Sequence, residues 1–407
     1  MISTDTSTLA PSPVGPRNGK PISVCLLISS LEFGGAERQV VEMIRSFDRQ
    51  KVKPIVCSLS DQVPLARYLP GNREDLSIVQ KHGKYDFTTV FRVAKLLRQH
   101  RVDVVHAFLF DAEIVARLAA RIAGVPVVIG SERNTDYVRP RLHTVALKST
   151  QGLFDVIVAN STSGKNFNMR TLGLADSRIE VVHNGVDEEK FQPDRKAGLA
   201  FRERLGISPS APLIGMVGSY KRQKGQDCFL KMAARVRQQI PGAHFLLVGE
   251  PLRDDLEETT RFQSEVQQLA ASLRMSDCCR FLGNQQDMKA VYNACDATAL
   301  LSRREGTPNV VLESMACGVP VIAADVADNA MIILNGKTGF VVPREDHEAA
   351  AVCAIKILND WAFRQELSEN ARKHVCEQFS LRVAASKLEN IYARCLRTKR
   401  GGDDLGN

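Results

Sequence analysis

The sequence predicts an α/β protein of two similar domains with a cleft between them, each domain a doubly wound parallel sheet that helices cover on both faces. The first observation is length, because 407 residues, 44% hydrophobic and 25% charged, are globular in composition and too many for one ordinary core. The second is that short apolar runs alternate with amphipathic helical stretches, which is typical of parallel sheets. The third is that this alternation occurs in two series, separated by a polar passage.

The first series predicts a Rossmann-like N-terminal domain over residues 21–190. Its first strand, 22–29 (ISVCLLIS), runs into a Gly-Gly pair that opens an amphipathic helix. Further strands are predicted at 52–59, 102–108, 125–131, 154–160 and 178–184. Residues 1–20 are rich in Ser, Thr and Pro and have no apolar core, so we expect a disordered tail and not a signal peptide.

The second series predicts a similar C-terminal domain over residues 212–378, after a polar, proline-containing linker at 191–211. Its strands are expected at 213–219, 243–249, 278–283, 297–302, 320–325 and 339–342. After Pro343 the chain is helical in pattern to about Arg397. We expect residues 379–397 to form a C-terminal crossover helix that packs back on the N-terminal domain, followed by a flexible tail at 398–407.

Composition narrows the classes of partner and the compartment. The ten cysteines are scattered without a C-x-x-C pair, which predicts reduced thiols in a cytoplasmic protein, and no apolar run approaches membrane-spanning length. A net charge of +8 suits an acidic partner, which could be nucleic acid, an anionic lipid surface or a phosphate-bearing substrate. Because no zinc finger, aromatic RNA-binding strand or basic heptad helix occurs, we expect no nucleic-acid partner.

The stretch SRREGTPNVVLESMACGVPVIA, residues 302–323, predicts an anion site. It lies between two buried strands, with Thr307 as a plausible N-cap, Pro308 at the first helical position and Gly318 at the stop. In parallel α/β sheets, ligands bind outside the carboxyl ends of strands, where the N-terminus of a helix presents free N–H groups. Phosphate is the ligand that such a position favours.

Two glutamates, eight residues apart, flank that helix opening. Asn309 and Glu313 share one helix face, so Glu313 lies one turn from the anion site and could accept hydrogen bonds from ribose hydroxyls. Glu305, at the strand tip, could reach whatever the phosphate carries. The alternative is that both are ordinary solvated glutamates, one on an exposed helix face and one in a polar loop.

The order of several short motifs along the chain leads to a family. The matching pieces are Gly34-Gly35-Ala36-Glu37-Arg38, Val104-Val105-His106-Ala107, Asn184-Gly185-Val186-Asp187, Val217-Gly218 with Lys224-Gly225, Phe281-Leu282-Gly283, and Glu305 to Glu313 followed by Met315-Ala316-Cys317-Gly318. Together they resemble a GT-B glycosyltransferase of family 4, the group of retaining enzymes that use nucleotide-sugar donors. Each piece is weak alone, but the resemblance runs through nearly the whole chain.

The resemblance implies roles for these residues. Glu305 and Glu313 resemble the E-x7-E pair of the family, with Glu313 on the nucleotide ribose and Glu305 on the donor sugar. Lys224, after the strand that ends at Gly218, matches the phosphate lysine. The sequence departs from the family at Ser219, where many relatives carry a phosphate-binding arginine, and the neighbouring Arg222 or Lys221 could compensate.

Further residues complete the expected nucleotide-sugar site. Gly34 and Gly35 would let the backbone approach the diphosphate across the cleft, and a tight strand-to-helix turn is their structural alternative. The helix that opens at Pro308 would present the backbone N–H groups of Asn309 and Val310 to the diphosphate. We expect the base beside residues 283–287 (GNQQD), at Asn284.

The expected catalysis uses neither metal nor cofactor, because the chain contains no D-x-D motif and the family does without one. On the acceptor side, many relatives place a histidine after the strand equivalent to 125–131, and here Glu132 occupies about that place, followed by Arg133. His106 ends the preceding strand and is expected to point to the cleft mouth. Its alternative is a structural hydrogen-bonding role.

The sequence thus predicts a metal-independent hexosyl- or N-acetylhexosaminyl-transferase. The resemblance implies that it moves a sugar with retention from a nucleotide diphosphate, with UDP as the expected carrier, to an acceptor hydroxyl of a lipid-linked or cell-surface glycan precursor. The enzymatic alternative is a GT-B epimerase acting on UDP-GlcNAc, and the alternative from another class is a catalytically inactive nucleotide-binding scaffold. A dehydrogenase is disfavoured because no G-x-G-x-x-G follows the first strand.

Two basic segments predict peripheral attachment to the inner face of the cell membrane. In 88–101 (TTVFRVAKLLRQHR), an apolar side is flanked by arginines and a lysine, a pattern that suits an anionic lipid surface. A further basic segment, 138–148, follows on the acceptor side of the cleft. The alternative for 88–101 is an ordinary domain helix whose apolar side packs on the sheet.

Overall fold

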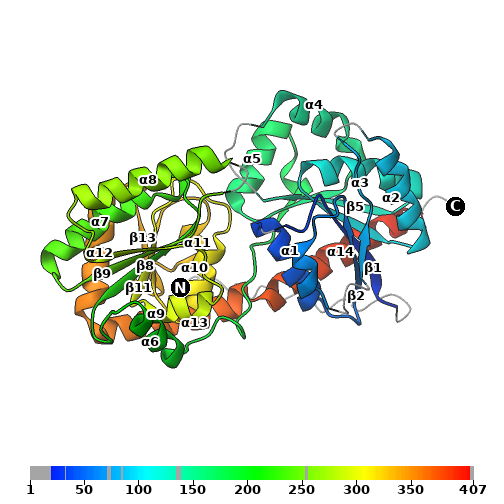
Figure 1. Cartoon of the computed structure of the whole chain (residues 1–407). Helices are drawn as coiled ribbons and strands as arrows, with labels where there is room; N and C mark the ends of the chain where they lie inside the picture. Colours follow the sequence, from blue (N-terminus) through cyan, green and yellow to red (C-terminus); the bar gives the residue numbers. More distant parts are fainter. Residues whose placement is uncertain are drawn as a thin grey trace, which may run out of the picture.

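A computed structural model of the chain describes residues 20–32, 34–70, 75–83, 86–133, 139–252 and 255–403. Two α/β domains lie side by side, and a long helical segment near the C-terminus runs along both (Figure 1). The predicted fold class of two Rossmann-like domains is confirmed. The expected tail at 1–20 lies outside the described residues, with the exception of Lys20. Residues 404–407 also lie outside the described residues.

The N-terminal domain is built on a seven-stranded parallel sheet in the order β3-β2-β1-β4-β5-β6-β7. Its strands are β1 (Ile22–Ile28), β2 (Val52–Ser58), β3 (Leu76–Ile78), β4 (Val104–Phe108), β5 (Val127–Glu132), β6 (Val156–Ala159) and β7 (Ile179–Val181). Each predicted apolar run contains a strand, and the three-residue edge strand β3 was missed because it is too short to show a period.

The C-terminal domain repeats this topology in a six-stranded parallel sheet, with the order β10-β9-β8-β11-β12-β13. Its strands are β8 (Leu213–Val217), β9 (His244–Val248), β10 (Cys279–Leu282), β11 (Ala297–Leu300), β12 (Val321–Ala324) and β13 (Gly339–Val342). In both sheets the strand order reverses after the first strand, between β1 and β4 and between β8 and β11. Such switch points are where α/β sheets bind ligands.

Helices cover both faces of the N-terminal sheet. Alternate residues of β1 face opposite cores: Val24, Leu26 and Ile28 pack with α1 and α14, whereas Cys25 and Leu27 pack with α2 and α3. The helices are α1 (Gly35–Ser46), α2 (Thr88–Gln99), α3 (Phe110–Ala123), α4 (Arg141–Ser149) and α5 (Thr162–Leu172), with the short 3-10 turns η2 (Pro64–Tyr68), η3 (Gln151–Leu153) and η4 (Asp176–Arg178).

The C-terminal sheet is covered in the same way, with α7, α8 and α12 on one face and α6, α9, α10 and α13 on the other. These elements are α6 (Arg195–Arg204), η5 (Arg222–Lys224), α7 (Gln226–Gln239), α8 (Leu256–Ser272), α9 (Met288–Ala294), α10 (Asn309–Ala316), α11 (Asn329–Ile332), α12 (His347–Asn359) and α13 (Trp361–Phe379). The region expected as a linker, 191–211, holds α6, which packs so closely on α9 that a Cβ at Gly198 would lie 2.1 Å from the carbonyl oxygen of Asn293.

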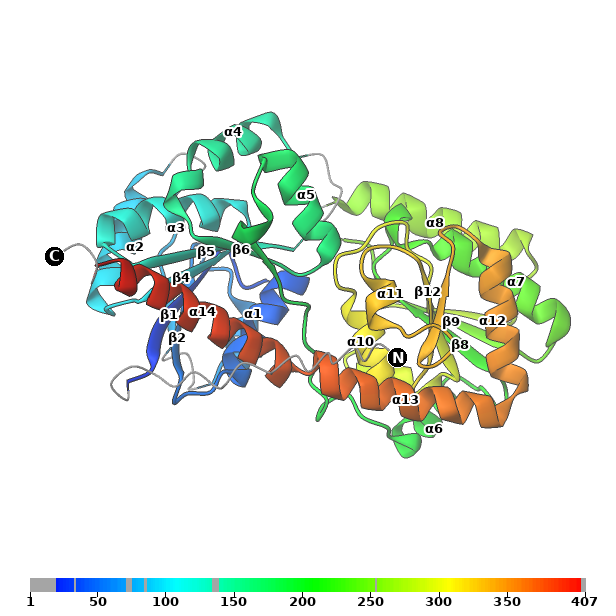
Figure 2. The same ribbon diagram turned by 180° about the vertical axis from the view of Figure 1, so that it is seen from behind.

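The chain returns to the N-terminal domain through α14 (Leu381–Asp403), which follows α13 end to end and lies along the N-terminal domain (Figure 2). At the crossing, Val186 and Leu381 exchange backbone hydrogen bonds with the opposite segment, at 2.9 Å each. The helix continues beyond residue 397, where we expected a flexible tail to start. Ion pairs of Lys399 with Asp155 (2.7 Å) and Arg400 with Asp103 (2.9 Å) hold this extension on the domain.

One expectation about the N-terminal helices is wrong. The apolar side of residues 88–101, which would have had to meet lipid, is buried against the sheet as part of α2: Val90, Val93, Ala94, Leu96 and Leu97 all belong to the core. A helix on a doubly wound sheet needs an apolar side for that packing, so amphipathicity alone does not indicate a membrane.

Candidate active site

The C-terminal switch point brings two predicted residues together. Lys224 lies in the turn η5 after β8, and Glu305 lies in the loop after the neighbouring strand β11. The Nζ of Lys224 lies 2.7 Å and 3.0 Å from the two carboxylate oxygens of Glu305, and the hydroxyl of Ser302 donates to Oε1 at 2.7 Å. A cation and a buried carboxylate from adjacent strand ends therefore form the floor of a site where ligands of this fold bind.

Gly225 explains why the turn can lie so close to the loop. Its φ of +75° is in the left-handed region, and a Cβ there would lie 2.1 Å from the carbonyl oxygen of Leu301. Only glycine meets both conditions without strain. This close approach places the Lys224 side chain over the loop that carries Glu305.

Glu313 lies on α10, one turn below its N-terminus, and is buried. Its carboxylate accepts a hydrogen bond from the hydroxyl of Tyr292 at 2.7 Å and pairs with Arg38 of the N-terminal domain at 3.1 Å. The alternative of a solvated glutamate is therefore wrong. Burial lowers the pKa of Arg38, but Glu313 and Glu42 more than offset this, so the pKa is raised.

The loop that opens α10 also contacts the N-terminal domain. The side-chain amide of Asn184 donates to the carbonyl of Thr307 (3.2 Å) and to Oδ1 of Asn309 (2.8 Å). The hydroxyl of Thr307 donates to the carbonyl of Asn160 across the seam, so it does not cap α10, and Pro308 is the N-cap instead. In the first turn, the N–H of Val311 donates to the carbonyl of Pro308 at 3.1 Å, whereas the N–H groups of Asn309 and Val310 precede the first helical hydrogen bond and remain suited to an anion.

The glycines expected at the diphosphate occupy two strand-to-helix turns. Gly34 is the N-cap of α1, in extended backbone, and Gly35 starts that helix with open space where a Cβ would project. Gly218 follows β8, and its N–H donates to the carbonyl of Val248 at 2.9 Å. The open position at Gly35 leaves room for a ligand close to the backbone.

Two other predicted side chains lie outside this cluster. Arg222 stacks over Phe262 at 5.0 Å and pairs with Glu265 of α8, so its guanidinium is engaged away from Glu305. Asn284, expected at the base, is exposed, and both its backbone and side-chain nitrogens donate to the carboxylate of Glu250, at 3.1 Å and 2.9 Å. A base that uses this backbone N–H would have to replace Glu250.

His106 does not point to the cleft mouth. It lies inside β4, fully buried, where Nδ1 lies 2.8 Å from the hydroxyl of Tyr392 on α14 and the ring stacks on Phe108. Burial lowers the pKa of this imidazole well below its usual value. The structure thus places His106 between the sheet and the crossover helix.

Glu132 and Arg133 end β5 on the N-terminal side of the seam. The Glu132 carboxylate is buried, accepting from Arg139 at 2.7 Å and from the side-chain amide of Asn168 at 3.1 Å. Arg133 donates to Oδ1 of Asn184 at 2.9 Å, and its carbonyl lies close to Gly306 of the Glu305 loop. The strand end therefore reaches the donor loop through Arg133.

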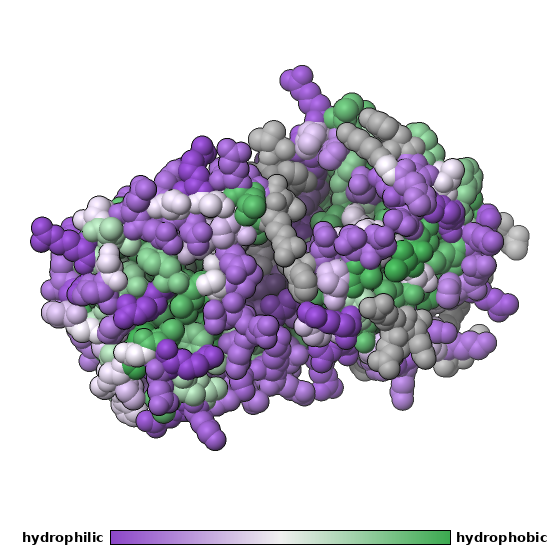
Figure 3. All heavy atoms as spheres, viewed as in Figure 1, coloured by the Kyte–Doolittle hydropathy of each residue, from purple (hydrophilic) through white to green (hydrophobic). Residues whose placement is uncertain are grey.

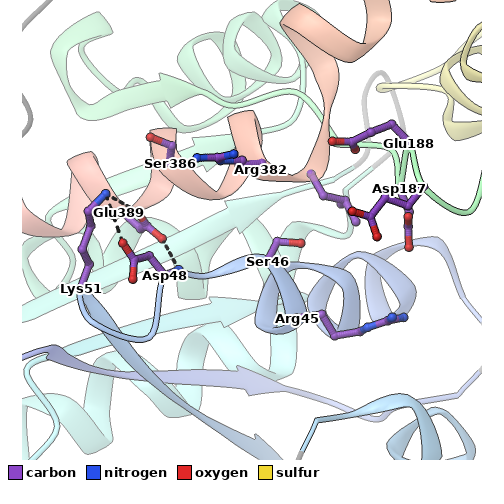
Figure 4. A pocket seen from close by; sticks show the side chains of 11 residues that line it. Arg45, Ser46, Asp48, Lys51, Asp187, Glu188, Arg382, Ser386 and Glu389 are labelled. Atoms are coloured by element: carbon purple, nitrogen blue, oxygen red, sulfur yellow. Dashed lines mark hydrogen bonds and ion pairs between the residues drawn. The ribbon is translucent and has the colours of Figure 1, made fainter.

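The surface between the domains is hollowed, and the visible rim of the hollow is mostly hydrophilic (Figure 3). A separate cavity of about 580 Å³ lies between the end of α1, the segment after β7 and the start of α14 (Figure 4). Its charged lining is mainly acidic: Asp48, Asp187, Glu188, Glu189 and Glu389 against Arg45, Lys51 and Arg382. An acidic lining does not suit a phosphate-bearing ligand, so the switch point is the better candidate for the ligand site.

Two family models match successive parts of the chain. The model described as Glycosyltransferase Family 4 matches residues 33–190, and the one described as Glycosyl transferases group 1 matches residues 199–374. The chain is a family 4 glycosyltransferase of the GT-B fold.

Similar proteins carry related names. The chain is 28% identical to a D-inositol 3-phosphate glycosyltransferase of Salinispora arenicola, over 97% of this chain and 91% of that one. It is 25% identical to an Escherichia coli UDP-Gal:alpha-D-GlcNAc-diphosphoundecaprenol alpha-1,3-galactosyltransferase, over 83% and 86%. The crystal structure of Anabaena Alr3699/HepE in complex with UDP superposes with a TM-score of 0.80 at 19% identity, covering 92% of this chain and 100% of that one.

Several residues of this glycosyltransferase's candidate site were missed from the sequence. Tyr292 and Ser302 bind the two glutamates, and Asn160 meets the Thr307 loop from the opposite domain. Ser302 stands three residues before Glu305 at a strand end, which could have indicated it. Tyr292 and Asn160 are distant in sequence, so only the fold brings them to the site.

Within the described residues, no group of three or more His, Cys, Asp or Glu side chains is placed to hold a metal ion. In the same described part of the glycosyltransferase, no helix has the length and apolar character needed to cross a membrane.

Proposed function

We propose that this glycosyltransferase transfers a sugar, with retention of anomeric configuration, from a UDP-sugar to an acceptor hydroxyl. The sugar is a hexose or N-acetylhexosamine. The proposed acceptor is a lipid-linked or cell-surface glycan precursor, and the proposed place of action is the cytoplasmic face of a membrane, without a metal ion.

The cluster of Lys224, Glu305 and the opening of α10 carries the proposal. When a sugar–diphosphate bond breaks, negative charge grows on the departing phosphate and positive character grows on the sugar. Lys224 and the N–H groups that open α10 would stabilise the phosphate, while Glu305 would lie beside the sugar. Because Lys224 pairs with Glu305 at 2.7 Å, a bound phosphate would compete for that lysine.

Glu313 is the proposed ribose contact. It lies about one helical turn from the helix opening, where a nucleoside attached to the diphosphate would come within reach. Its present partners, Tyr292 and Arg38, would fix the orientation of the carboxylate. The UDP carrier and the retention of configuration rest on the family resemblance and on the names of similar proteins, among them one that uses UDP-Gal.

Attachment to a membrane surface is supported by side chains on the outside of the N-terminal domain. On α2, Phe91 is 64% exposed, just before the helix Phe87 is 72% exposed, and Lys95 and Arg98 on the same outer side are exposed too. On α4, exposed Leu142 and Val145 lie between exposed Arg141 and Lys148. Apolar side chains next to cations suit an anionic lipid surface.

The experiment is a panel of nucleotide sugars incubated with the protein and a lipid and oligosaccharide extract, with free UDP and product mass both measured. UDP release that requires an acceptor, together with a product heavier than the acceptor by one sugar, would support the transferase. Release of UDP without acceptor would favour the epimerase alternative. If no nucleotide sugar gives UDP or a changed sugar under any condition, the proposal is wrong.

A further inference from the structure

Arg133 lies where the two domains meet, directly after β5. Its Nη1 donates to Oδ1 of Asn184 at 2.9 Å and its Nε donates to the hydroxyl of Ser131 at 3.0 Å, and the guanidinium lies over the ring of Phe108 at 5.2 Å. Asn184 in turn donates to Thr307 and Asn309 at the opening of α10. One side chain therefore separates this guanidinium from the proposed diphosphate site.

The charge on Arg133 is not compensated in the way that its neighbours' charges are. Lys224 pairs with Glu305, Arg38 with Glu313, Arg139 with Glu132 and Arg222 with Glu265. The guanidinium of Arg133 makes no ion pair with any carboxylate of the described residues, and its hydrogen-bond partners, Ser131 and Asn184, are neutral. The adjacent Glu132 carboxylate accepts from the Arg133 backbone N–H at 3.1 Å and is not paired with the guanidinium.

Burial lowers the pKa of Arg133 to about 10, which still leaves the group charged at neutral pH. A partly buried cation without a paired carboxylate is costly for the fold, because neutral hydrogen-bond partners replace only part of its lost hydration. Such positions beside a cleft are candidates for ligand binding.

A cavity of about 210 Å³ adjoins Arg133 in the N-terminal domain. Leu109, Glu113, Glu132 and His143 are among its lining residues. Leu109 has φ 72° and ψ 155°, a backbone conformation that residues other than glycine rarely adopt. Strain of this kind persists where surrounding structure enforces it, and it clusters at ligand sites.

We infer that Arg133 binds a phosphate group of a substrate at the domain seam, an inference that rests on the proposed function. A guanidinium presents paired N–H donors that match phosphate oxygens. A second cation would serve a phosphate here, because Lys224 is paired with Glu305 and Arg222 is turned toward α8. The phosphate could belong to the departing diphosphate of the donor, at the opening of α10, or to an acceptor seated in the cavity.

Binding of inorganic pyrophosphate, measured by isothermal titration calorimetry, tests the inference without any assumption about the nucleotide. Arg133→Met keeps the stem over Phe108 and removes the charge, and Arg133→Lys keeps the charge and loses the paired donors. We expect the Met variant to bind at least about tenfold more weakly and the Lys variant to lie between it and the wild type. Arg394→Met, at an exposed arginine paired with Glu180, is the matched control and should bind as the wild type does.

Two further titrations distinguish the source of the phosphate. If the donor supplies it, Arg133→Met weakens UDP binding and leaves uridine binding unchanged. If the acceptor supplies it, UDP binding is unchanged and inorganic phosphate binds more weakly to the UDP-saturated variant.

The inference is overturned if the folded Met and Lys variants bind pyrophosphate, UDP and phosphate as the wild type does. It is also overturned if uridine binding falls together with UDP binding, since Arg133 would then only support the fold. A Met variant that does not fold leaves the Lys variant to decide. Failure of the proposed function has a separate sign, since the wild type would then release no UDP with any donor and acceptor, whatever Arg133 does to pyrophosphate.

Discussion

The two sides of the domain seam hold their charged residues differently. On the C-terminal side, Lys224, Glu305 and Glu313 bind one another or a few polar partners beside an open helix N-terminus. On the N-terminal side, Glu132 and His106 are bound to their own scaffold, by Arg139 and by Tyr392. This difference supports our proposal that the donor binds on the C-terminal side, where a ligand could exchange with the existing partners.

Among the predicted changes, substitution of Glu305 should have the largest effect on activity. We expect Glu305→Gln to lower kcat by about 10²–10³-fold with little change in the KM for donor, because its contact would matter most when charge develops on the sugar. Steady-state kinetics with donor varied measures both constants. The control is Glu348→Gln, an exposed glutamate on α12 paired with Arg235, which should behave as wild type.

An unchanged kcat in Glu305→Gln would mean that the carboxylate only anchors Lys224 and takes no part in turnover. A rise in KM without a fall in kcat would instead assign Glu305 to binding of the donor.

The N-terminal side offers a stability test at Glu113, a carboxylate buried beside Arg117 with its Oε1 accepting from the backbone of Ser131. Burial raises the pKa of Glu113 to about 7. The contribution of this group to stability is therefore complete below the unfolded pKa, near 4.3, and is lost as pH rises through about 7, by up to roughly 3 kcal/mol.

Urea unfolding at pH 5, 6, 7 and 8 measures this dependence. Glu113→Gln should lose less stability than the wild type over that range, while the exposed control Glu348→Gln should follow the wild type. Parallel curves for Glu113→Gln and wild type would mean that Glu113 is ionised throughout this pH range. Burial on the N-terminal side would then not hold this carboxyl in its neutral form.

Substitution of Glu313 tests whether the C-terminal side of the seam binds the donor nucleoside. Its contact with ribose would be shared by the ground and transition states, so Glu313→Gln should weaken UDP binding by about tenfold or more and change kcat less. Calorimetric titration with UDP measures the affinity, and uridine should show a similar loss. Wild-type affinity for both would remove the ribose assignment while leaving that of Glu305 intact.

The fold was predictable because its signals are local and repeated. Every apolar run that alternates with a helix became a strand, and the Gly-Gly turn at residues 34 and 35 and the loop after β11 could be placed from their neighbours alone. The partners of the site residues could not be predicted from the sequence, because Tyr292 reaches Glu313 and Asn184 reaches Asn309 only through tertiary packing. The acceptor side was hardest, since a histidine at a strand end gives the same pattern whether it faces a ligand or, as His106 does, a helix.

A smaller effect, on membrane binding, is expected when the exposed aromatic side chains of the N-terminal domain are replaced. Replacing both Phe87 and Phe91 by Ser should reduce binding to anionic vesicles by about tenfold, since each ring loses burial in lipid. Sedimentation with anionic and neutral vesicles at several salt concentrations measures it, and binding should weaken as salt rises. Trp361→Ser, at an aromatic that is 66% exposed on the C-terminal domain, is the control. Equal binding to neutral and anionic vesicles, or none to either, would contradict membrane attachment and leave the family assignment untouched.

The smallest expected effect is that of metal removal, for which we predict none. The negative charge of the departing diphosphate must be met by cations or dipoles, and Lys224, the opening of α10 and Arg133 would provide them in this chain. Activity with excess EDTA should therefore equal activity with added Mg²⁺ or Mn²⁺, with UDP release as the readout. If EDTA abolishes activity and Mn²⁺ restores it, the positive groups gathered at the seam do not suffice for the leaving diphosphate. The donor side would then need a bound metal ion to neutralise the charge of the diphosphate.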